Sequence, residues 1–222
     1  MKKTLVSMMA LVLSLSMLAP TAQAKFAPKF SVSLSDTKAL GNPALSFHLE
    51  FAEDDEEIGN FIGYLPKGFD IATDEAIPDD EEIGSGDIAI AFGPTCNPAS
   101  PIKSPRPQAP IPATFFEKAR TDDEIDAGVH SVWLLDLEPA NRVRLLVSGS
   151  KLTGWKIEGA PTPSDHTCNA LTVDLTINAT SESGVPIVTN AKKPGAKKFM
   201  ADIVSQDSPA IAHFEQIITI TK

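Results

Sequence analysis

Apolar and polar residues alternate along much of the chain. The alternation is unbroken in residues 30–35 (FSVSLS), 45–51 (LSFHLEF) and 171–177 (LTVDLTI). A period of two residues puts successive side chains on opposite faces of an extended chain, so these segments are predicted to be strands with one buried face. No stretch shows the 3.6-residue period of an amphipathic helix over three turns. The pattern therefore predicts an all-β protein.

Further short apolar runs are separated by residues that favour turns. These runs lie at residues 58–65, 88–92, 129–137, 143–147, 154–159, 198–204 and 211–221. Short strands at such spacing are typical of antiparallel sheets that fold back on themselves. We expect about ten strands in an antiparallel β-sandwich, either immunoglobulin-like or jelly-roll-like.

The start of the chain has the features of an export signal. Two lysines follow Met1, residues 5–18 are almost entirely apolar, and residues 21–24 (TAQA) end in the small-x-small pattern that signal peptidase reads. We expect residues 1–24 to be removed and the mature chain, 25–222, to be secreted, periplasmic or part of a cell envelope. The Met-Lys-Lys start is typical of a bacterial leader.

The two cysteines lie at the ends of two apolar runs. Cys96 follows the alternating stretch GDIAIAF, and Cys168 precedes the alternating stretch NALTVDLTI. In an exported protein two cysteines usually pair, so we expect a disulfide bond that ties two strand ends together. Two free buried thiols are the alternative.

A proline-rich segment interrupts the chain near its middle. Residues 94–112 contain seven prolines, a composition that favours an extended connector without backbone donors. We expect one β-sandwich domain over residues 25–222 with this segment as a connector. A division into residues 25–93 and 113–222 is the alternative, and a proline-rich ligand for a partner is a weaker one.

The chain is acidic. Its formal net charge is −10, and removal of a leader with two lysines and no acidic residue leaves −12. Nucleic acids and anionic membranes bind basic faces, so neither is expected as a partner. No segment beyond the leader approaches the roughly 20 apolar residues of a membrane-spanning helix.

Two acidic segments offer oxygen ligands for calcium. They are residues 53–57 and residues 79–87, and the second also has glycines that let a loop fold around an ion. The candidate calcium ligands are Asp79, Asp80, Glu82 and Asp87. Neither segment has EF-hand spacing, so solvated loops are the favoured interpretation. We therefore expect no cofactor, with calcium as the alternative.

Little in the chain points to catalysis. The four histidines (His48, His130, His166 and His213) form no zinc-binding spacing, and the Gly-x-Ser-x-Gly motif of many hydrolases does not occur. Trp133 and Trp155 could form a platform for sugars, but burial in the core is the favoured interpretation. We therefore expect a protein that is not an enzyme.

Several turn segments occur in a characteristic succession. They are Gly41-Asn42-Pro43, Leu65-Pro66-Lys67-Gly68-Phe69, Ile77-Pro78, Ile83-Gly84-Ser85-Gly86, Thr189-Asn190 and Pro194-Gly195. In this succession the chain resembles a group of uncharacterised secreted bacterial β-rich proteins. The resemblance implies an extracytoplasmic β domain and brings no functional residues with it.

Three classes of function follow. The leading hypothesis is a non-catalytic secreted or envelope module that acts through surface contacts with a protein or envelope partner, because loops carry function in such folds. The second is a calcium-assisted binder of a small apolar or carbohydrate ligand, which an exposed tryptophan would favour. The third is a hydrolase, which a cleft with two carboxylates and one histidine would favour.

Overall fold

The computed structural model describes residues 26–222 except 53–54, 56–57, 74, 93–105, 108–109, 138–140, 160–168 and 207. The described residues form fourteen strands and one short helix. Every pairing between these strands is antiparallel. The prediction of an all-β antiparallel protein is confirmed. No helix in the described ranges has the length and apolar character needed to cross a membrane.

Short strands follow one another along the chain, with a single helix between the seventh and the eighth. In chain order the elements are β1 (Lys29–Leu34), β2 (Leu45–Glu50), β3 (Ile58–Leu65), β4 (Asp70–Ile71), β5 (Glu82–Phe92), β6 (Arg106–Pro107), β7 (Ile111–Lys118), α1 (Asp122–Asp126), β8 (Val129–Leu137), β9 (Asn141–Ser150), β10 (Gly154–Gly159), β11 (Asn169–Ile177), β12 (Val188–Thr189), β13 (Gly195–Ser205) and β14 (Ile211–Ile220).

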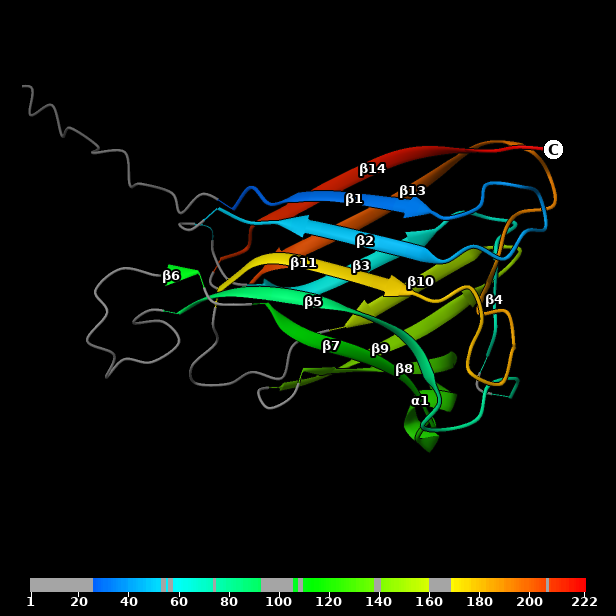
Figure 1. The fold of residues 1–222 in the computed structure, drawn as a ribbon, viewed down its shortest axis with the longest axis horizontal. Helices are drawn as coiled ribbons and strands as arrows, with labels where there is room; N and C mark the ends of the chain where they lie inside the picture. The colour runs from blue at the N-terminus through cyan, green and yellow to red at the C-terminus, as the bar shows by residue number, and fades with distance from the viewer. Residues whose placement is uncertain are drawn as a thin grey trace, which may run out of the picture.

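Eleven of the strands form one continuous sheet. Their order is β1-β2-β11-β5-β7-β8-β9-β10-β3-β13-β14, with β6 added beside β5. The sheet curls until β1 and β14 lie side by side, which gives a nearly closed, barrel-like shape (Figure 1). A separate pair, β4 and β12, lies at one end. The strands therefore pair around one interior, whereas the sequence predicted the two separate sheets of a sandwich.

Strands from before and after the proline-rich segment alternate in this sheet. Strand β11 lies between β2 and β5, and β3 lies between β10 and β13. The strands described on either side of the segment therefore belong to one sheet. Of the segment 94–112, the structure describes residues 106–107, which form β6, and residues 110–112, which lead into β7; β6 pairs with the end of β5.

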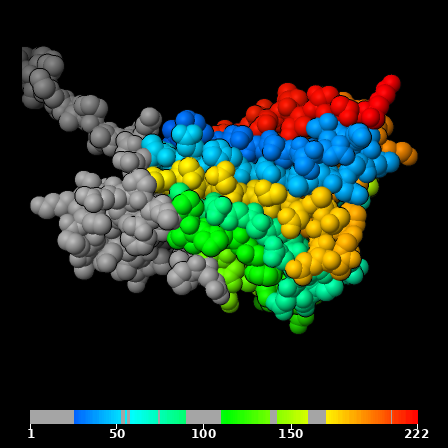
Figure 2. Space-filling model, viewed as in Figure 1, coloured from blue at the N-terminus to red at the C-terminus, as the bar shows by residue number. Residues whose placement is uncertain are grey.

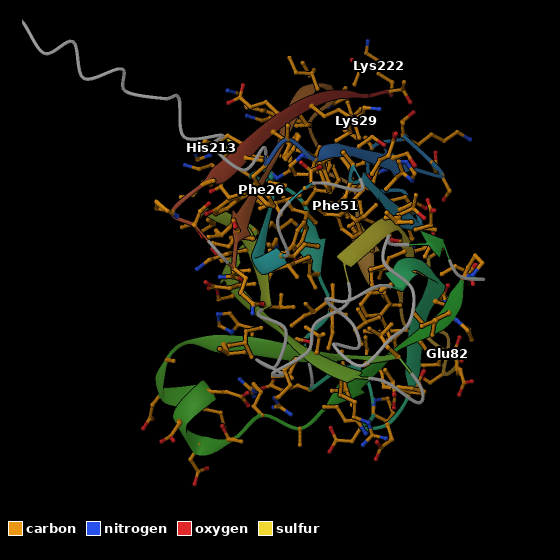
Figure 3. The ribbon with its side chains drawn as sticks, turned by 90° about the vertical axis from the view of Figure 1, so that its left-hand side faces the viewer. Phe26, Lys29, Phe51, Glu82, His213 and Lys222 are labelled. Atoms are coloured by element: carbon orange, nitrogen blue, oxygen red, sulfur yellow. The ribbon has the colours of Figure 1, made fainter. Side chains whose placement is uncertain are left out.

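The interior is filled by aromatic and aliphatic side chains. Phe30, Phe47, Phe61 and Phe214 pack with ring centroids 5.7–6.3 Å apart. Phe26 and Phe51 mark one end of this interior, the end that faces the viewer in Figure 3. Toward the other end, the ring of Phe69 packs edge-on against Phe199 with a centroid separation of 5.2 Å. Burial of such large side chains supplies most of the favourable free energy of folding.

Both tryptophans belong to this core. Trp133 is fully buried and Trp155 is 6% exposed. The indole Nε1 of Trp155 donates a hydrogen bond of 3.0 Å to the carbonyl of Phe69, which satisfies this buried N–H group. The favoured interpretation of the tryptophans as core residues is confirmed, and neither side chain forms a platform on the surface.

Strand β5 bends sharply at two glycines. The pairing of β5 with β7 shifts by one residue between Glu82 and Gly84. A Cβ atom on Gly84 would lie 2.3 Å from the carbonyl oxygen of Thr176, and one on Gly86 would lie 1.9 Å from that of Asp174. Only glycine permits so close an approach of two backbones, so the Gly-Ser-Gly sequence lets β5 follow the curve of the sheet.

A buried carboxylate lies on the inner face of β7. Glu117 is fully buried, and both of its oxygens lie within hydrogen-bonding distance of the hydroxyl of Ser131, at 2.7 and 2.9 Å. A carboxylate transferred from water into a core is costly unless donors replace the lost hydration. Ser131 is itself fully buried on β8 and supplies such a donor.

The contribution of this donor can be measured with two nearly isosteric substitutions. Ser131→Thr keeps the hydroxyl and Ser131→Val removes it, while both add similar volume. We expect the valine variant to unfold with a free energy about 2 kcal/mol below that of the threonine variant, because the buried Glu117 oxygens lose a hydrogen-bond donor. Urea unfolding at pH 7 measures the difference. Equal stabilities would show that the hydroxyl does not support Glu117.

The acidic residues 122–126 form a one-turn helix, α1. The Thr121 hydroxyl accepts from the Glu124 amide (3.3 Å), and the Glu124 carboxylate accepts from the Thr121 amide (2.7 Å). Arg144 of β9 donates to both carboxylate oxygens of Glu124 from its Nη2 atom, at 2.8 and 2.9 Å. Partial burial raises the pKa of Glu124, but the Thr121 and Arg144 donors outweigh it, so the pKa lies below its usual value.

This lowered pKa predicts a pH-dependent stability. The ionised carboxylate stabilises the fold at pH values above about 4.5, and this contribution is lost as the pH falls through the folded-state pKa. We expect Glu124→Gln to lower the free energy of unfolding by about 1 kcal/mol at pH 7 and by progressively less below about pH 4. Urea unfolding across this pH range tests the prediction, with the exposed Glu182→Gln as control. A cost that does not change with pH would contradict it.

Candidate functional site

A polar groove crosses the outer face of four neighbouring strands. It has a volume of about 480 Å3 and is lined by residues of β1, β2, β11 and β5. These strands lie side by side on the face turned toward the viewer in Figure 2, with β11 in yellow. Because side chains alternate between the two faces of a strand, the residues that point outward here come from every second position.

The strand register arranges the groove residues in two rows. In the first row, Ser31 lies opposite His48, His48 opposite Asp174, and Asp174 opposite Asp87. The second row lies two residues away and contains only hydroxyl side chains, which are Ser33, Ser46, Thr176 and Ser85. Directly opposed side chains have Cβ atoms roughly 5 Å apart, so each row forms a continuous polar strip across the four strands.

A histidine and a carboxylate pair at the centre of the first row. The Nδ1 atom of His48 lies 2.5 Å from Oδ1 of Asp174, and the two side chains are 45% and 58% exposed. A carboxylate that accepts from Nδ1 fixes the tautomer and orientation of the ring. The other ring nitrogen, Nε2, then remains for a ligand or for water.

The second carboxylate of the row lies next to the first. Asp87 is exposed and stands opposite Asp174, and within the described part of the chain Asp87 has no ion-pair partner. Like charges directly opposite each other on a sheet are mutually destabilising. The groove therefore has a local excess of negative charge that a cationic group would relieve.

The hydroxyl row is suited to hydrogen bonding in both directions. The hydroxyls of Ser46 and Thr176 lie 2.9 Å apart and bond to each other across β2 and β11. Ser33 and Ser85, at the two ends of the row, are exposed. Each hydroxyl can both donate and accept, so the row can bind either amines or hydroxyl groups of a ligand.

The first row contains the residue types of a hydrolytic triad, but its surroundings differ from those of a hydrolase. Among the described residues no hydrogen bond joins Ser31 to His48, although a general base must reach its nucleophile. The central strands β2 and β11 are paired on both sides, so their amides are used within the sheet and not for an oxyanion. The arrangement is better suited to binding than to cleavage.

The four calcium candidates are divided between two places. Asp79 and Asp80 are exposed in the turn before β5, and Glu82 begins that strand. Asp80 forms an ion pair with Lys118. Asp87 lies apart from them in the polar groove. Within the described ranges, no three acidic, histidine or cysteine side chains gather in a way that could hold a metal ion.

The first acidic segment is described only at Asp55. Residues 53–54 and 56–57 lie outside the described residues. Asp55 is 4% exposed, and its carboxylate accepts from the backbone amides of Ala27 (3.0 Å) and Ala52 (2.8 Å). This carboxylate therefore joins the residues before β1 to those after β2.

Cys96 and Cys168 also lie outside the described residues, so their bond stays a prediction. The strands that lead to them are hydrogen-bonded neighbours, with Asn169 of β11 opposite Ala91 of β5. Cys168 immediately precedes Asn169, and Cys96 follows the end of β5 by four residues. The chain leaves these two strands at the same end of the sheet, as a bridge requires.

A second histidine–carboxylate pair lies away from the groove. Nδ1 of His213 on β14 is 2.7 Å from Oδ1 of Asp202 on β13. The Tyr64 hydroxyl donates to the other oxygen of Asp202 at 3.4 Å, and burial together with the Asp202 charge raises the pKa of Tyr64. His130 contacts the ring of Trp155, and His166 lies outside the described residues.

The groove was not predicted from the sequence. Of its residues, only Asp87 was a candidate site residue, and His48 was considered among the four histidines that form no zinc-binding spacing. A usable signal was present, because the polar positions of residues 30–35, 45–51 and 171–177 are largely Ser, Thr, His and Asp.

No protein-family model matches this chain, and no curated protein matches it.

Proposed function

We propose that the protein is an exported, non-catalytic β module that acts through surface contacts, and that the polar groove is its contact surface. The observation that supports this proposal most strongly is the register that brings His48, Asp174 and Asp87 into one strip beside a row of four hydroxyls. In β folds, functional side chains are held in position by a rigid framework. Here the sheet itself is the framework that holds the groove side chains.

The charge of the groove indicates the chemistry of its partner. Asp87 and Asp174 stand opposite each other, and His48 forms its ion pair with Asp174. The mature chain expected from the sequence is also strongly acidic. Complementary charge increases association rates and fixes the orientation of a partner. We infer that the partner is a protein segment that carries lysine or arginine side chains.

A charge-matched pair of variants tests this proposal. Asp87→Asn with Asp174→Asn removes the two groove carboxylates, while Asp122→Asn with Asp123→Asn removes the same charge from α1. We expect the groove variant to weaken binding of a lysine-rich peptide about tenfold or more, because close charge pairs are lost. The α1 variant should weaken binding of the same peptide only slightly. Calorimetry at a fixed salt concentration measures both affinities. Equal losses would indicate non-specific attraction and contradict the proposal.

A hydrolase is the second candidate, because the groove contains one histidine and two carboxylates. The open surface and the paired backbone of β2 and β11 argue against it. Hydrolysis of a nitrophenyl ester by the wild type and by His48→Ala distinguishes the two candidates. Activity that depends on His48 would favour the hydrolase.

A calcium-assisted binder of an apolar or carbohydrate ligand is the third candidate. Burial of Trp133 and Trp155 removes the sugar platform that this class would use. Thermal unfolding with calcium or with a chelator tests the acidic turn at residues 79–82, because an ion that binds the native state raises its melting temperature. A rise of several degrees would favour this candidate over a partner with basic side chains.

A further inference from the structure

The two edge strands of the barrel-like sheet cannot continue its hydrogen-bonding pattern. Eleven strands follow one another with antiparallel neighbours, so the first and the last, β1 and β14, run in the same direction. The bridge between Lys38 and Thr221, just beyond these strands, is accordingly parallel. A closed sheet with only antiparallel neighbours needs an even number of strands, so this sheet is one strand short.

Gln216 of β14 makes hydrogen bonds across the seam between β1 and β14. The Gln216 carboxamide donates from Nε2 to the Val32 carbonyl (2.7 Å) and accepts at Oε1 from the Val32 amide (2.8 Å). These are the two bonds that an opposite residue of a neighbouring strand would make with Val32. Backbone bonds resume only beyond the strands, where Thr221 pairs with Thr37 (2.8 Å) and Ala39 (3.0 Å).

The two sides of the seam differ in character. On the inner side, Phe30 and Phe214 pack with centroids 5.7 Å apart. On the outer side, β1 presents exposed serines, and β14 presents Glu215 and the 66% exposed Ile217. A strand placed between β1 and β14 would therefore need apolar side chains on one face and mainly polar side chains on the other.

We propose that this seam accepts an extended segment of a partner polypeptide as a twelfth strand, antiparallel to both β1 and β14. Entry requires displacement of the Gln216 carboxamide and separation of Phe30 from Phe214, whereas entry elsewhere would break a complete ladder of backbone bonds. The incoming backbone replaces the Gln216 contacts and offers further donors and acceptors along both edges. This site does not use the groove carboxylates and does not depend on the function proposed for them.

The test uses a fluorescent peptide with the sequence of residues 171–178 (LTVDLTIN), which alternates as the seam requires. A control peptide carries proline in place of its valine and second leucine. A locked protein has Ser33→Cys and Ile217→Cys joined by a short bismaleimide. These residues have the same 184-residue offset as Val32 and Gln216, so they face each other across the seam. Wild type treated with the same reagent controls for the native cysteines.

Fluorescence anisotropy should show that the alternating peptide binds the wild type and binds Gln216→Ala roughly tenfold more tightly, because no side chain has to be displaced. The locked protein should bind the alternating peptide at least tenfold more weakly than the wild type does. The wild type should bind the proline peptide at least tenfold more weakly than the alternating peptide. Absence of binding to Gln216→Ala, or equal binding to the locked protein, would overturn the proposal. Dimerisation of Gln216→Ala that excludes the peptide would identify a second copy as the occupant, and would also overturn it.

Discussion

Reduction of the oxidised protein is expected to lower its free energy of unfolding by about 4 kcal/mol, the value for a long loop closed by a disulfide bond. The expected bond joins Cys96 and Cys168, which follow β5 and precede β11. These two strands pair over eight residues and carry Asp87 and Asp174 opposite each other. The bond would therefore stabilise the part of the sheet that forms the groove.

Urea unfolding with and without reductant measures this effect. The variant Cys96→Ser with Cys168→Ser is the control, because reductant cannot change its stability. Mass spectrometry after alkylation should find both thiols blocked in the oxidised wild type and free after reduction. Two thiols that react without reduction would contradict the prediction.

Replacement of Gly86 by alanine is expected to lower the free energy of unfolding by about 3 kcal/mol. This is near the upper end of the range for a side chain forced into a packed site. The new Cβ atom would lie 1.9 Å from the carbonyl oxygen of Asp174 and 2.8 Å from Cα of Leu175. Both are backbone atoms of β11, so relief requires separation of β5 from β11. Such a shift also moves Asp87 of β5 relative to Asp174 of β11.

Gly63→Ala in β3 is a matched control, since its Cβ atom would meet the ring of Phe61 at 3.2 Å and the nearest backbone atom, the Ile157 oxygen, only at an ordinary contact distance of 4.0 Å. We expect the free energy of unfolding of this variant to lie within about 1 kcal/mol of the wild-type value. Urea unfolding compares the two. A Gly86→Ala variant as stable as Gly63→Ala would show that β5 and β11 do not approach each other as closely as the structure indicates.

The strands with strict alternation were predictable from the sequence, because one face of each lies against the core. Residues 30–35, 45–51 and 171–177 correspond to β1, β2 and β11. The Gly-Ser-Gly sequence at 84–86 was interpreted as part of a turn, although it lies inside β5. Glycine favours turns and tolerates sharp bends in strands alike, and only the neighbouring backbone of β11 distinguishes the two.

The order of the strands was not predictable in the same way. Alternation shows that a strand has a buried face, but it does not show which strand lies beside it. Gln216 has nothing in its local sequence to mark it as the bridge between β1 and β14. The same is true of the groove, because Ser31, His48, Asp87 and Asp174 meet only when four strands from distant parts of the chain adopt one register.

The most direct test of the central claim, that the polar groove is the contact surface, is an NMR titration of the histidine side chains with a lysine-rich peptide. His48 reports on the groove, and His213 is an internal control because it has the same type of carboxylate partner on other strands. We predict that the His48 signals shift and saturate while the His213 signals stay in place, and that Asp87→Asn with Asp174→Asn abolishes the shift. An unchanged His48, or equal shifts at both histidines, would contradict the claim.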